Sequence, residues 1–375
     1  MKMHNGSHFI AALSFCNVVA RDSNVKKGTL EPAKLAFATI IVVMITIMIA
    51  GDLPLRGELP TVPTAGPPLR GRYRVIISTD IGGGDEDDIQ SMIHFLLYSD
   101  LFDTEGIISS PPGKGRRRDI LEVIDKYEKD YPNLKTYSDK YSAPNYLRSI
   151  AKQGAINPAP EKGYSSPTEG SKWIIHCAKK KDPRPLYVFV WGAITDVAQA
   201  LHDDSSIKQK IRVHFIASWN QKQDQNAFRY IDKNHADLWF IHNNSTFRGW
   251  YIGGNQNEDL GNRSFVDKHV KDHGALGKYF VPLKGGCIKM GDTPSYAFLL
   301  RGNPDDPTKD SWGGRFIKRK NRPNWWIDDP DPAFAEGGHY GAKTVNIWRR
   351  EYLRDWQKRM DRCIEKATLN NTQKQ

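Results

Sequence analysis

The sequence predicts an α/β domain with a mainly parallel sheet flanked by helices, of the Rossmann-like type. Short apolar runs typical of buried strands alternate with segments whose apolar residues recur every three or four positions. Such alternation favours parallel strands joined by crossover helices. A glycine-rich turn between the first strand and the first helix, at residues 78–88, is the second observation, because ligands of such sheets bind where the strands end.

Each element is predicted from the local pattern of apolar residues. Strands rich in β-branched and aromatic residues are expected at 75–77, 106–108, 187–190 and 213–216. Helices with one apolar face are expected at 89–97, 120–127, 171–180, 195–201, 234–241, 265–273 and 296–300. No internal repeat interrupts this order, so residues 72–365 are expected to form one folded domain, followed by a polar tail at 366–375.

The turn at residues 78–88 carries more carboxylates than a helix start needs. Asp80 directly follows the first strand, glycines occupy 82–84, and acids fill 85–88. Glycines allow the backbone to turn sharply and to approach a ligand closely. The helix dipole accounts for one or two acids at a helix start, but not for Asp80 and four in a row. Because these carboxylates would repel a phosphate, the turn predicts a catalytic site or a site for a hard cation.

The charge and cysteine content exclude several classes of protein. The net charge of +11 comes partly from basic runs at 114–118, 179–181 and 318–322, which are typical of solvated faces but can attract acidic polymers or a membrane surface. No nucleic-acid-binding motif accompanies these runs, so no nucleic-acid partner is expected. The cysteines are too few and too widely spaced for a disulfide scaffold or a zinc site: Cys16, Cys177, Cys287 and Cys363.

The N-terminal part of the sequence predicts a membrane anchor or a signal segment. Residues 35–51 carry no charge and approach the length of a spanning helix. The basic residues in 1–34 predict a cytoplasmic tail, and the proline- and glycine-rich segment 52–71 predicts a linker. We therefore expect a single-pass membrane protein with an extracytosolic domain, or a secreted protein if the apolar segment is cleaved. Sequons at Asn243, Asn244 and Asn262 agree with a glycoprotein.

Three segments resemble motifs of the nucleoside hydrolase family and occur in the same order. Residues 78–82 followed by the pair at 87–88 are similar to the N-terminal aspartate motif Asp-x-Asp-x-Gly-x-Asp-Asp, with Ser78 in place of the first Asp and a longer turn. Residues 188–198 are similar to the second signature, a strand followed by Gly-Pro-Leu-Thr-Asn, and residues 291–295 to the C-terminal aspartate motif.

The longer turn is closer to the nucleoside hydrolase-like domain of bacterial "cellulose-binding" proteins, which are related to inosine-uridine preferring nucleoside hydrolases. Residues 311–316 and 349–361 also resemble the C-terminal part of that domain. Read without the resemblance, these two segments are a glycine loop and a charged, solvated helix, and residues 191–196 are a strand-to-helix turn.

The resemblance implies a set of site residues. It makes Asp80 the catalytic base, and it makes Asp80, Asp88, the Trp191 carbonyl and Asp292 the ligands of Ca²⁺, with Mg²⁺ the weaker alternative. It places the following residues at the substrate: Asp87, Trp219, Asn220 and Asn226. Two simpler interpretations stay open, namely that Asp292 caps a helix and that Trp219 belongs to the core.

Two functions follow from these residues. The first is metal-dependent hydrolysis of an N-glycosidic bond to ribose or a related sugar, in which a cation lowers the pKa of a bound water. The second is a carbohydrate- or cell-wall-binding domain that keeps the pocket with little or no activity. Gly291 stands where the family has a His that protonates the leaving group, which favours the second function. The expected partner is a small glycoside or a glycan.

Overall fold

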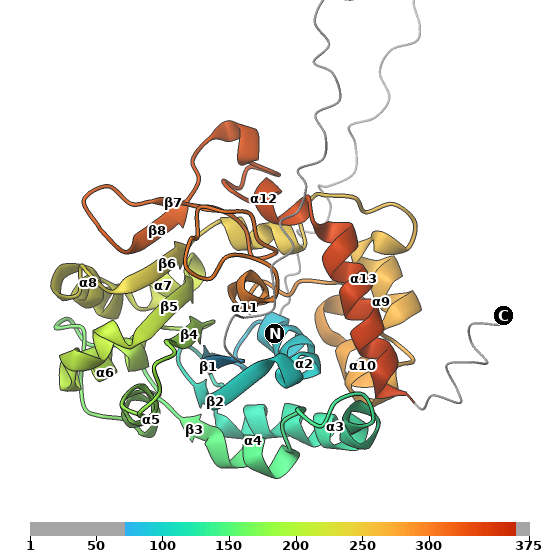
Figure 1. Ribbon diagram of the computed structural model, residues 1–375, viewed down its shortest axis with the longest axis horizontal. Helices are drawn as coiled ribbons and strands as arrows, with labels where there is room; N and C mark the ends of the chain where they lie inside the picture. The colour runs from blue at the N-terminus through green and yellow to red at the C-terminus, as the bar shows by residue number, and fades with distance from the viewer. Residues whose placement is uncertain (1–71, 365–375) are drawn as a thin grey trace, which may run out of the picture. The chain divides into compact units, whose positions relative to one another are not determined.

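The computed structural model describes residues 72–364 and shows an eight-stranded sheet with helices on both faces (Figure 1). The strand order is β3-β2-β1-β4-β5-β6-β8-β7, and every neighbouring pair is parallel except β7 with β8. The predicted α/β class and mainly parallel sheet are therefore confirmed. The strands are β1 (Tyr73–Thr79), β2 (Phe102–Ser109), β3 (Ala151–Gln153), β4 (Leu186–Val190), β5 (Ile211–Ile216), β6 (Trp239–Asn243), β7 (Phe316–Lys318) and β8 (Trp325–Asp328).

Helices connect the strands and cover the sheet. The α-helices are α2 (Asp87–Leu97), α3 (Arg117–Lys135), α4 (Pro144–Ile150), α5 (Glu169–Ala178), α6 (Thr195–Asp203), α7 (Trp219–Gln223), α8 (Gln225–Asn234), α9 (Asn262–His269), α10 (Gly274–Phe280), α11 (Pro294–Leu300), α12 (Lys343–Asn346) and α13 (Arg349–Met360). Short 3₁₀ helices are η1 (Ser99–Leu101), η2 (Ser205–Gln209), η3 (Thr246–Trp250), η4 (Glu258–Leu260), η5 (Leu283–Gly286), η6 (Pro332–Phe334) and η7 (Asp361–Cys363).

Alternate residues of each strand face different helices. Val188 and Val190 of β4 belong to a buried cluster with the apolar side chains of α5, α6 and α8. Phe189, between them, points to the other face, where its ring centroid lies 6.3 Å from that of Tyr296 in α11. Phe95 of α2 contacts the same Tyr296 at 5.3 Å between ring centroids. Burial on both faces explains why these strands read as continuous apolar runs in the sequence.

The membrane expectation has no support in this structure. Within residues 72–364, no helix is long and apolar enough to cross a bilayer. The segments predicted at 1–34, 35–51, 52–71 and 366–375 lie outside the described residues. The expectation of a single-pass membrane protein is corrected accordingly.

The helix predicted at residues 234–241 is wrong. Helix α8 ends at Asn234, and β6 begins at Trp239 and runs beside β5. A short run with apolar residues at 238, 240 and 241 fits both a helical face and a buried strand, so its period alone does not decide. The pairing with β5, which is distant in sequence, decides for the strand.

The sequons lie on side chains that hold the fold. Asn243 is buried and accepts a hydrogen bond from the Phe247 N–H at 2.9 Å. Asn262 accepts one from the Arg349 guanidinium at 2.7 Å. Asn244 is exposed. These contacts give the expected glycoprotein no support at Asn243 and Asn262. The cysteines of the described part are free: Cys177, Cys287 and Cys363.

The sheet places the ends of β1 and β4 side by side. Chain connections leave β1 toward β2 on one side, while β4 and later strands lie on the other, so the strand order reverses between β1 and β4. Ligands of open α/β sheets bind at such a point. The Trp191 N–H after β4 donates to the Ser78 carbonyl of β1 at 2.7 Å, which joins the two strand ends. Asp80 and Gly192 follow directly.

We predict that Gly192→Ala destabilises the domain by roughly 1–3 kcal/mol, the usual range for overpacking. A Cβ atom at Gly192 would lie 2.5 Å from Ser110 Oγ and 2.8 Å from the backbone nitrogen of Asp80. Gly84→Ala is the matched control, because a Cβ atom at that position has no neighbour within 4 Å. Urea unfolding of both variants measures the difference, and equal midpoints would contradict the prediction.

Candidate functional site

A cavity of about 680 Å³ opens where β1, β4 and β5 end. Its lining comes from the turn after β1, from Trp191 after β4, from residues 216–220 after β5, from the region of η3 after β6, and from the loop before α11. The predicted site residues that line it are Asp80, Asp87, Asp88, Trp191, Trp219, Asn220 and Asp292. Residues more than 200 positions apart in the sequence therefore meet at one edge of the sheet.

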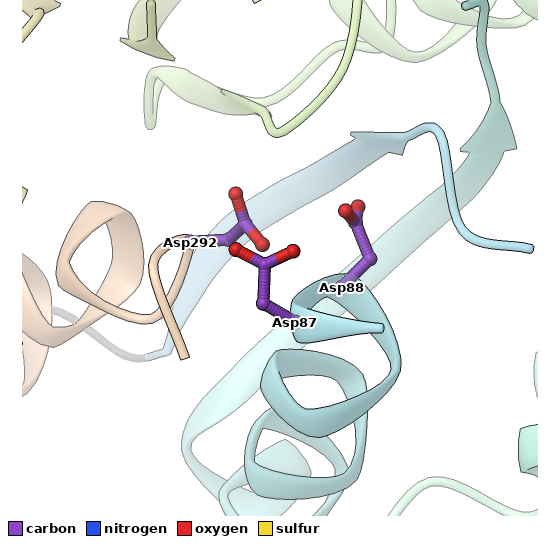
Figure 2. A group of neighbouring side chains, drawn as sticks. All are labelled: Asp87, Asp88 and Asp292. Carbon is purple, nitrogen blue, oxygen red and sulfur yellow. The ribbon is translucent and has the colours of Figure 1, made fainter. Parts of the chain in front are cut away.

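Three aspartates form the centre of this cavity. Figure 2 shows Asp87 and Asp88 rising from the start of α2 toward Asp292, which lies in the turn before α11. One carboxylate oxygen from each lies within 4.8 Å of the others. Asp88 and Asp292 are buried, and Asp87 is partly exposed.

The four consecutive acids in the turn after β1 form two groups with different partners. Thr79 Oγ1 donates a hydrogen bond to Asp88 and accepts one from the Ile81 N–H at 3.1 Å, which fixes Asp88 toward the cavity. Lys284 binds the other two acids: its Nζ contacts Asp85 at 2.5 Å, and its N–H donates to Glu86 at 2.8 Å. Asp87 and Asp88 are thereby left to face Asp292.

Gly82 permits the sharp turn that carries these acids. It adopts φ = 82°, in the left-handed region that favours glycine. The Asp80 carbonyl accepts a hydrogen bond from the Gly83 N–H at 2.9 Å, which closes the turn.

Burial and mutual repulsion raise the pKa values of all four aspartates. Burial raises the pKa of Asp80 to about 7. Burial, with the charges of neighbouring aspartates, raises the pKa values of Asp87, Asp88 and Asp292 well above the ordinary range. Asp80 and Asp88 are close enough to shift each other's pKa, so their repulsion requires a proton on one of them when no cation is bound. A bound cation would remove that requirement.

The aspartate cluster fits a cation with oxygen ligands. Asp292 Oδ2 is buried and has no hydrogen-bond partner within residues 72–364. The α11 N-cap is Thr293, and the Asp292 side chain makes no capping bond, so helix capping does not explain this residue. Two oxygens on one Ca²⁺ at 2.3–2.6 Å can lie at most about 5 Å apart, which the cluster satisfies.

The Trp191 carbonyl lies on the cavity wall and is held by Asn220. Asn220 Nδ2 donates to the Trp191 carbonyl at 2.5 Å and to the Ile216 carbonyl at 3.0 Å. The two N–H groups of this amide are therefore used, and only its oxygen can contact a ligand. The Trp191 indole donates to Ser295 Oγ at 2.8 Å, which fixes the residue from its other side.

Trp219 does not belong to the core. Its side chain is 63% exposed and lines the cavity. The preceding residue, Ser218, adopts φ = 53° and ψ = −108°, a conformation that side chains rarely take. This backbone turns the chain from β5 directly into α7, and it leaves the indole ring at the mouth of the cavity, where a sugar could stack on it.

Asn226 is not among the residues that line the cavity, so the structure does not bring it together with the other predicted site residues. It lies in α8, and its Nδ2 donates to the Ala159 carbonyl at 3.1 Å. Asp224 caps α8 through the Ala227 N–H. This cap starts a new helix that turns Asn226 toward the loop at residues 159–163.

The cavity residues that the sequence analysis missed include Arg248, Tyr251 and Lys289. Arg248 and Tyr251 belong to the segment that follows β6, the fourth parallel strand at this edge. If the sequence analysis had assigned a strand at 239–243, the residues after it would have been expected beside Asp80 and Trp191, at the same edge of the sheet. Lys289 lies three residues before Asp292, and no motif in the sequence marks it as a site residue.

Comparison with known proteins gives the family. The family model for "Cellulose-binding Sde182, nucleoside hydrolase-like domain" matches residues 74–316. Among curated protein sequences, none matches this chain. A solved structure of a nucleoside hydrolase-related protein from Saccharophagus degradans, described as associated with carbohydrate metabolism, is 26% identical with a TM-score of 0.63, over 79% of this chain and 72% of that one.

Nucleoside hydrolases themselves are more distant in structure. The inosine-uridine preferring enzyme from Bacillus anthracis is 16% identical with a TM-score of 0.42, over 76% of this chain and 99% of that one. The purine-preferring enzyme from Gardnerella vaginalis is 14% identical with a TM-score of 0.42, over 78% and 99%. The extent of the family match and its place over the cavity residues decide the assignment: this chain belongs to the cellulose-binding Sde182, nucleoside hydrolase-like domain family.

Proposed function

We propose that the domain hydrolyses a glycosidic bond, of the N-glycosidic type, with the help of a divalent cation, for which Ca²⁺ is the first choice and Mg²⁺ the second. The observation that carries the proposal is the aspartate cluster at the switch point of the sheet, with an unpartnered buried oxygen on Asp292. Asp80, Asp88, the Trp191 carbonyl and Asp292 are the proposed ligands, and the position of Asp87 supports it as a further ligand.

The residues divide the chemistry between them. A bound cation would supply an activated water and an anchor for sugar hydroxyls. Asp80 is the proposed base, as the family resemblance implies, because its buried carboxylate lines the cavity among the proposed ligands, where it could take a proton from a water on the cation. The Asn220 oxygen is free to accept a hydrogen bond from a sugar hydroxyl. Trp219 offers a flat surface to the sugar or to the leaving group.

Protonation of the leaving group is the weakest part of this site. Gly291 stands where the family carries a His, and a Cβ atom there would lie 3.1 Å from Asp87 Oδ2 and 3.4 Å from the Phe247 ring. A larger side chain at Gly291 would crowd Asp87. We therefore expect turnover mainly of substrates whose leaving group needs no proton.

We predict that the domain from residue 72 onward releases p-nitrophenol from p-nitrophenyl glycosides faster than it releases bases from nucleosides, and that a chelator stops both reactions. Asp80→Asn should lower the rate by roughly 10²–10⁴-fold, the usual contribution of a positioned base. Asp85→Asn is the matched control, since Asp85 is tied to Lys284. A wild-type domain that binds Ca²⁺ and turns over neither class of substrate would overturn the hydrolase proposal.

Carbohydrate binding without turnover is the second candidate, favoured by the exposed Trp219 and by the absence of a side chain at Gly291. For this function we predict that Trp219→Ala weakens sugar binding roughly twofold to tenfold, as expected for the loss of a stacking ring worth about 0.5–1.5 kcal/mol. Isothermal titration with methyl glycosides measures the change. Tyr340→Ala, at another exposed aromatic residue, is the control. Equal affinities for both variants would speak against a stacking role.

We also predict that the metal-free domain loses thermal stability as the pH rises. The folded-state pKa of Asp80, about 7, lies above the ordinary value of 3.8, so the folded protein binds more protons than the unfolded one between these values. Stability is therefore greatest below pH 4 for this group and falls as the pH rises through 7. Ca²⁺ should raise the melting temperature more at pH 8 than at pH 5. Melts in chelator and in Ca²⁺ at both pH values test this, and a Ca²⁺ effect independent of pH would contradict it.

A further inference from the structure

We propose that the cavity takes a sugar that carries an anionic group, a carboxylate or a phosphate, and that Arg248 and Lys289 bind this group. The inference rests on the proposed function, which places a sugar ring in the cavity. It adds the chemical class of the ligand, through two cations that the proposed mechanism does not use.

Arg248 is held in place while most of its donors stay available. Its Nη1 donates to the Asn244 carbonyl at 2.9 Å, and its Nη2 donates to Ser218 Oγ at 2.7 Å. A guanidinium has five N–H donors, so two are used and three have no acceptor within the described part of the chain. Because two bonds already fix the group, it would lose little freedom on binding an anion.

Lys289 lies on the same side of the cavity. Its ammonium is 5.8 Å from the ring centroid of Tyr251, and its backbone N–H donates to the Gln90 side chain at 2.9 Å. Arg248 also lies beside Tyr251: burial raises the pKa of Tyr251 to about 12, and the charge of Arg248 opposes this rise. Two cations thus flank one tyrosine on the cavity wall.

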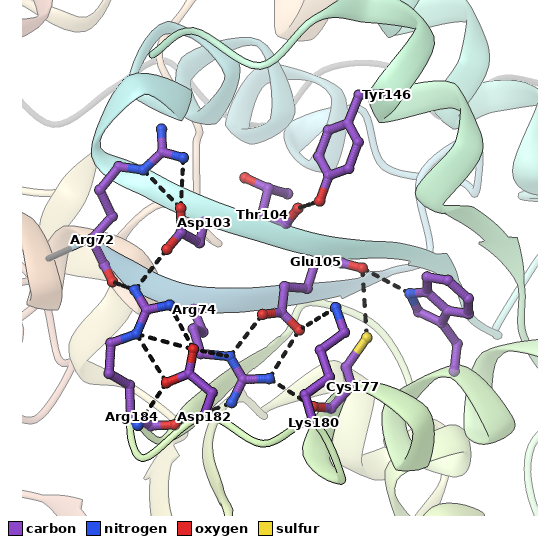
Figure 3. A network of polar contacts seen from close by, with 11 residues as sticks. Arg72, Arg74, Asp103, Thr104, Glu105, Tyr146, Cys177, Lys180, Asp182 and Arg184 are labelled. Atoms are coloured by element: carbon purple, nitrogen blue, oxygen red, sulfur yellow. Dashed lines mark hydrogen bonds and ion pairs between the residues drawn. The ribbon is translucent and has the colours of Figure 1, made fainter.

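Cations at the opposite edge of the sheet behave differently. Figure 3 shows a polar network there, in which Arg74 contacts Glu105 at 2.7 Å, and Arg184 contacts Asp103 at 2.6 Å and Asp182 at 2.7 Å. A second cavity lies over this network, but its guanidinium groups are already paired with carboxylates. The guanidinium charges in this cavity are therefore balanced by carboxylates without a ligand.

Arg248 and Lys289 form no ion pair within residues 72–364, although aspartates line the same cavity. The charge of Lys289 reaches Asp85, and Arg248 and the aspartates both act on Tyr251, but none of these aspartates lies within contact distance of either cation. Half-buried cations without a counter-charge are unfavourable, since part of their hydration is lost and no attraction replaces it. A cation on the aspartates and an anion on Arg248 and Lys289 would compensate both sets together.

A basic segment adjoins the cavity lining in the sequence. Pro112 and Gly113 line the cavity, and the chain continues directly into the basic run at 114–118. The side chains exposed in this run are Lys114, Arg117 and Arg118. Positive charge near a cavity raises the local concentration of an anionic ligand and speeds its approach.

Matched pairs of sugars test the proposal on the domain with Ca²⁺ present. The probes are methyl β-D-glucuronide against methyl β-D-glucoside, and ribose 5-phosphate against ribose, by isothermal titration. We expect at least one anionic member to bind roughly tenfold tighter or more than its neutral partner. Lys289→Met and Arg248→Gln should each remove most of this preference, because one hydrogen bond to a charged group is worth roughly tenfold or more in affinity. Lys309→Met removes the same charge from an exposed site outside the cavity and should leave it unchanged.

The outcomes separate this proposal from the proposed function. Tighter binding of the glucuronide than of the glucoside assigns a carboxylate as the anionic group. Tighter binding of ribose 5-phosphate than of ribose assigns a phosphate. Equal affinities within both pairs, or binding of no anionic sugar, would overturn the inference. A preference that survives Lys289→Met and Arg248→Gln would overturn it too. Calcium-dependent release of p-nitrophenol by the wild-type domain reports on the proposed function alone, and it can succeed while the anionic preference fails.

Discussion

Repulsion between buried carboxylates is the constraint on which the rest of this structure depends. Asp87, Asp88 and Asp292 bring their oxygens within 4.8 Å of one another at the ends of the central strands. Well-packed apolar residues in their place would often be at least as stable, because each buried charge loses its hydration. The fold holds the cluster nevertheless, since Thr79 fixes Asp88. Among residues 72–364, none donates a hydrogen bond to Asp292 Oδ2. Only protons or a cation relieve this repulsion.

The acidic half of the site could be predicted from the sequence because most of it lies in one turn. Asp80, Asp87 and Asp88 follow a recognisable strand, and the strand end fixes where they lie in the sheet. Asp292 was predicted through its motif, because no other Asp or Glu lies near it in the sequence. The hydrogen bond from Asn220 to the Trp191 carbonyl joins the segments that follow β4 and β5, and no local pattern predicts such a contact.

Sequence patterns failed where a local break or a pairing with another segment decides the structure. Asn220 and Asn226 are six positions apart, yet the break between α7 and α8 turns only Asn220 to the cavity. Strand β6 was taken for a helix because its period is ambiguous without its partner β5. That error hid Arg248 and Tyr251, which depend on β6 for their place. A local pattern thus predicts that a residue belongs to the site only when the helix or strand before that residue is assigned correctly.

The order of the strands arranges the cavity by charge. β1, β4, β5 and β6 are neighbours in that order, and they are followed in turn by the aspartates, the Trp191 carbonyl, Trp219 and Arg248. The aspartates of the first turn, the ring of Trp219 and the guanidinium of Arg248 thus follow different strands, while Lys289 and Asp292 reach the cavity from the segment before α11. Fixed charges of opposite sign favour one orientation of a charged ligand, since the reverse would set an anion against the aspartates. The strand order would therefore orient the proposed anionic sugar with its hydroxyls toward the proposed cation.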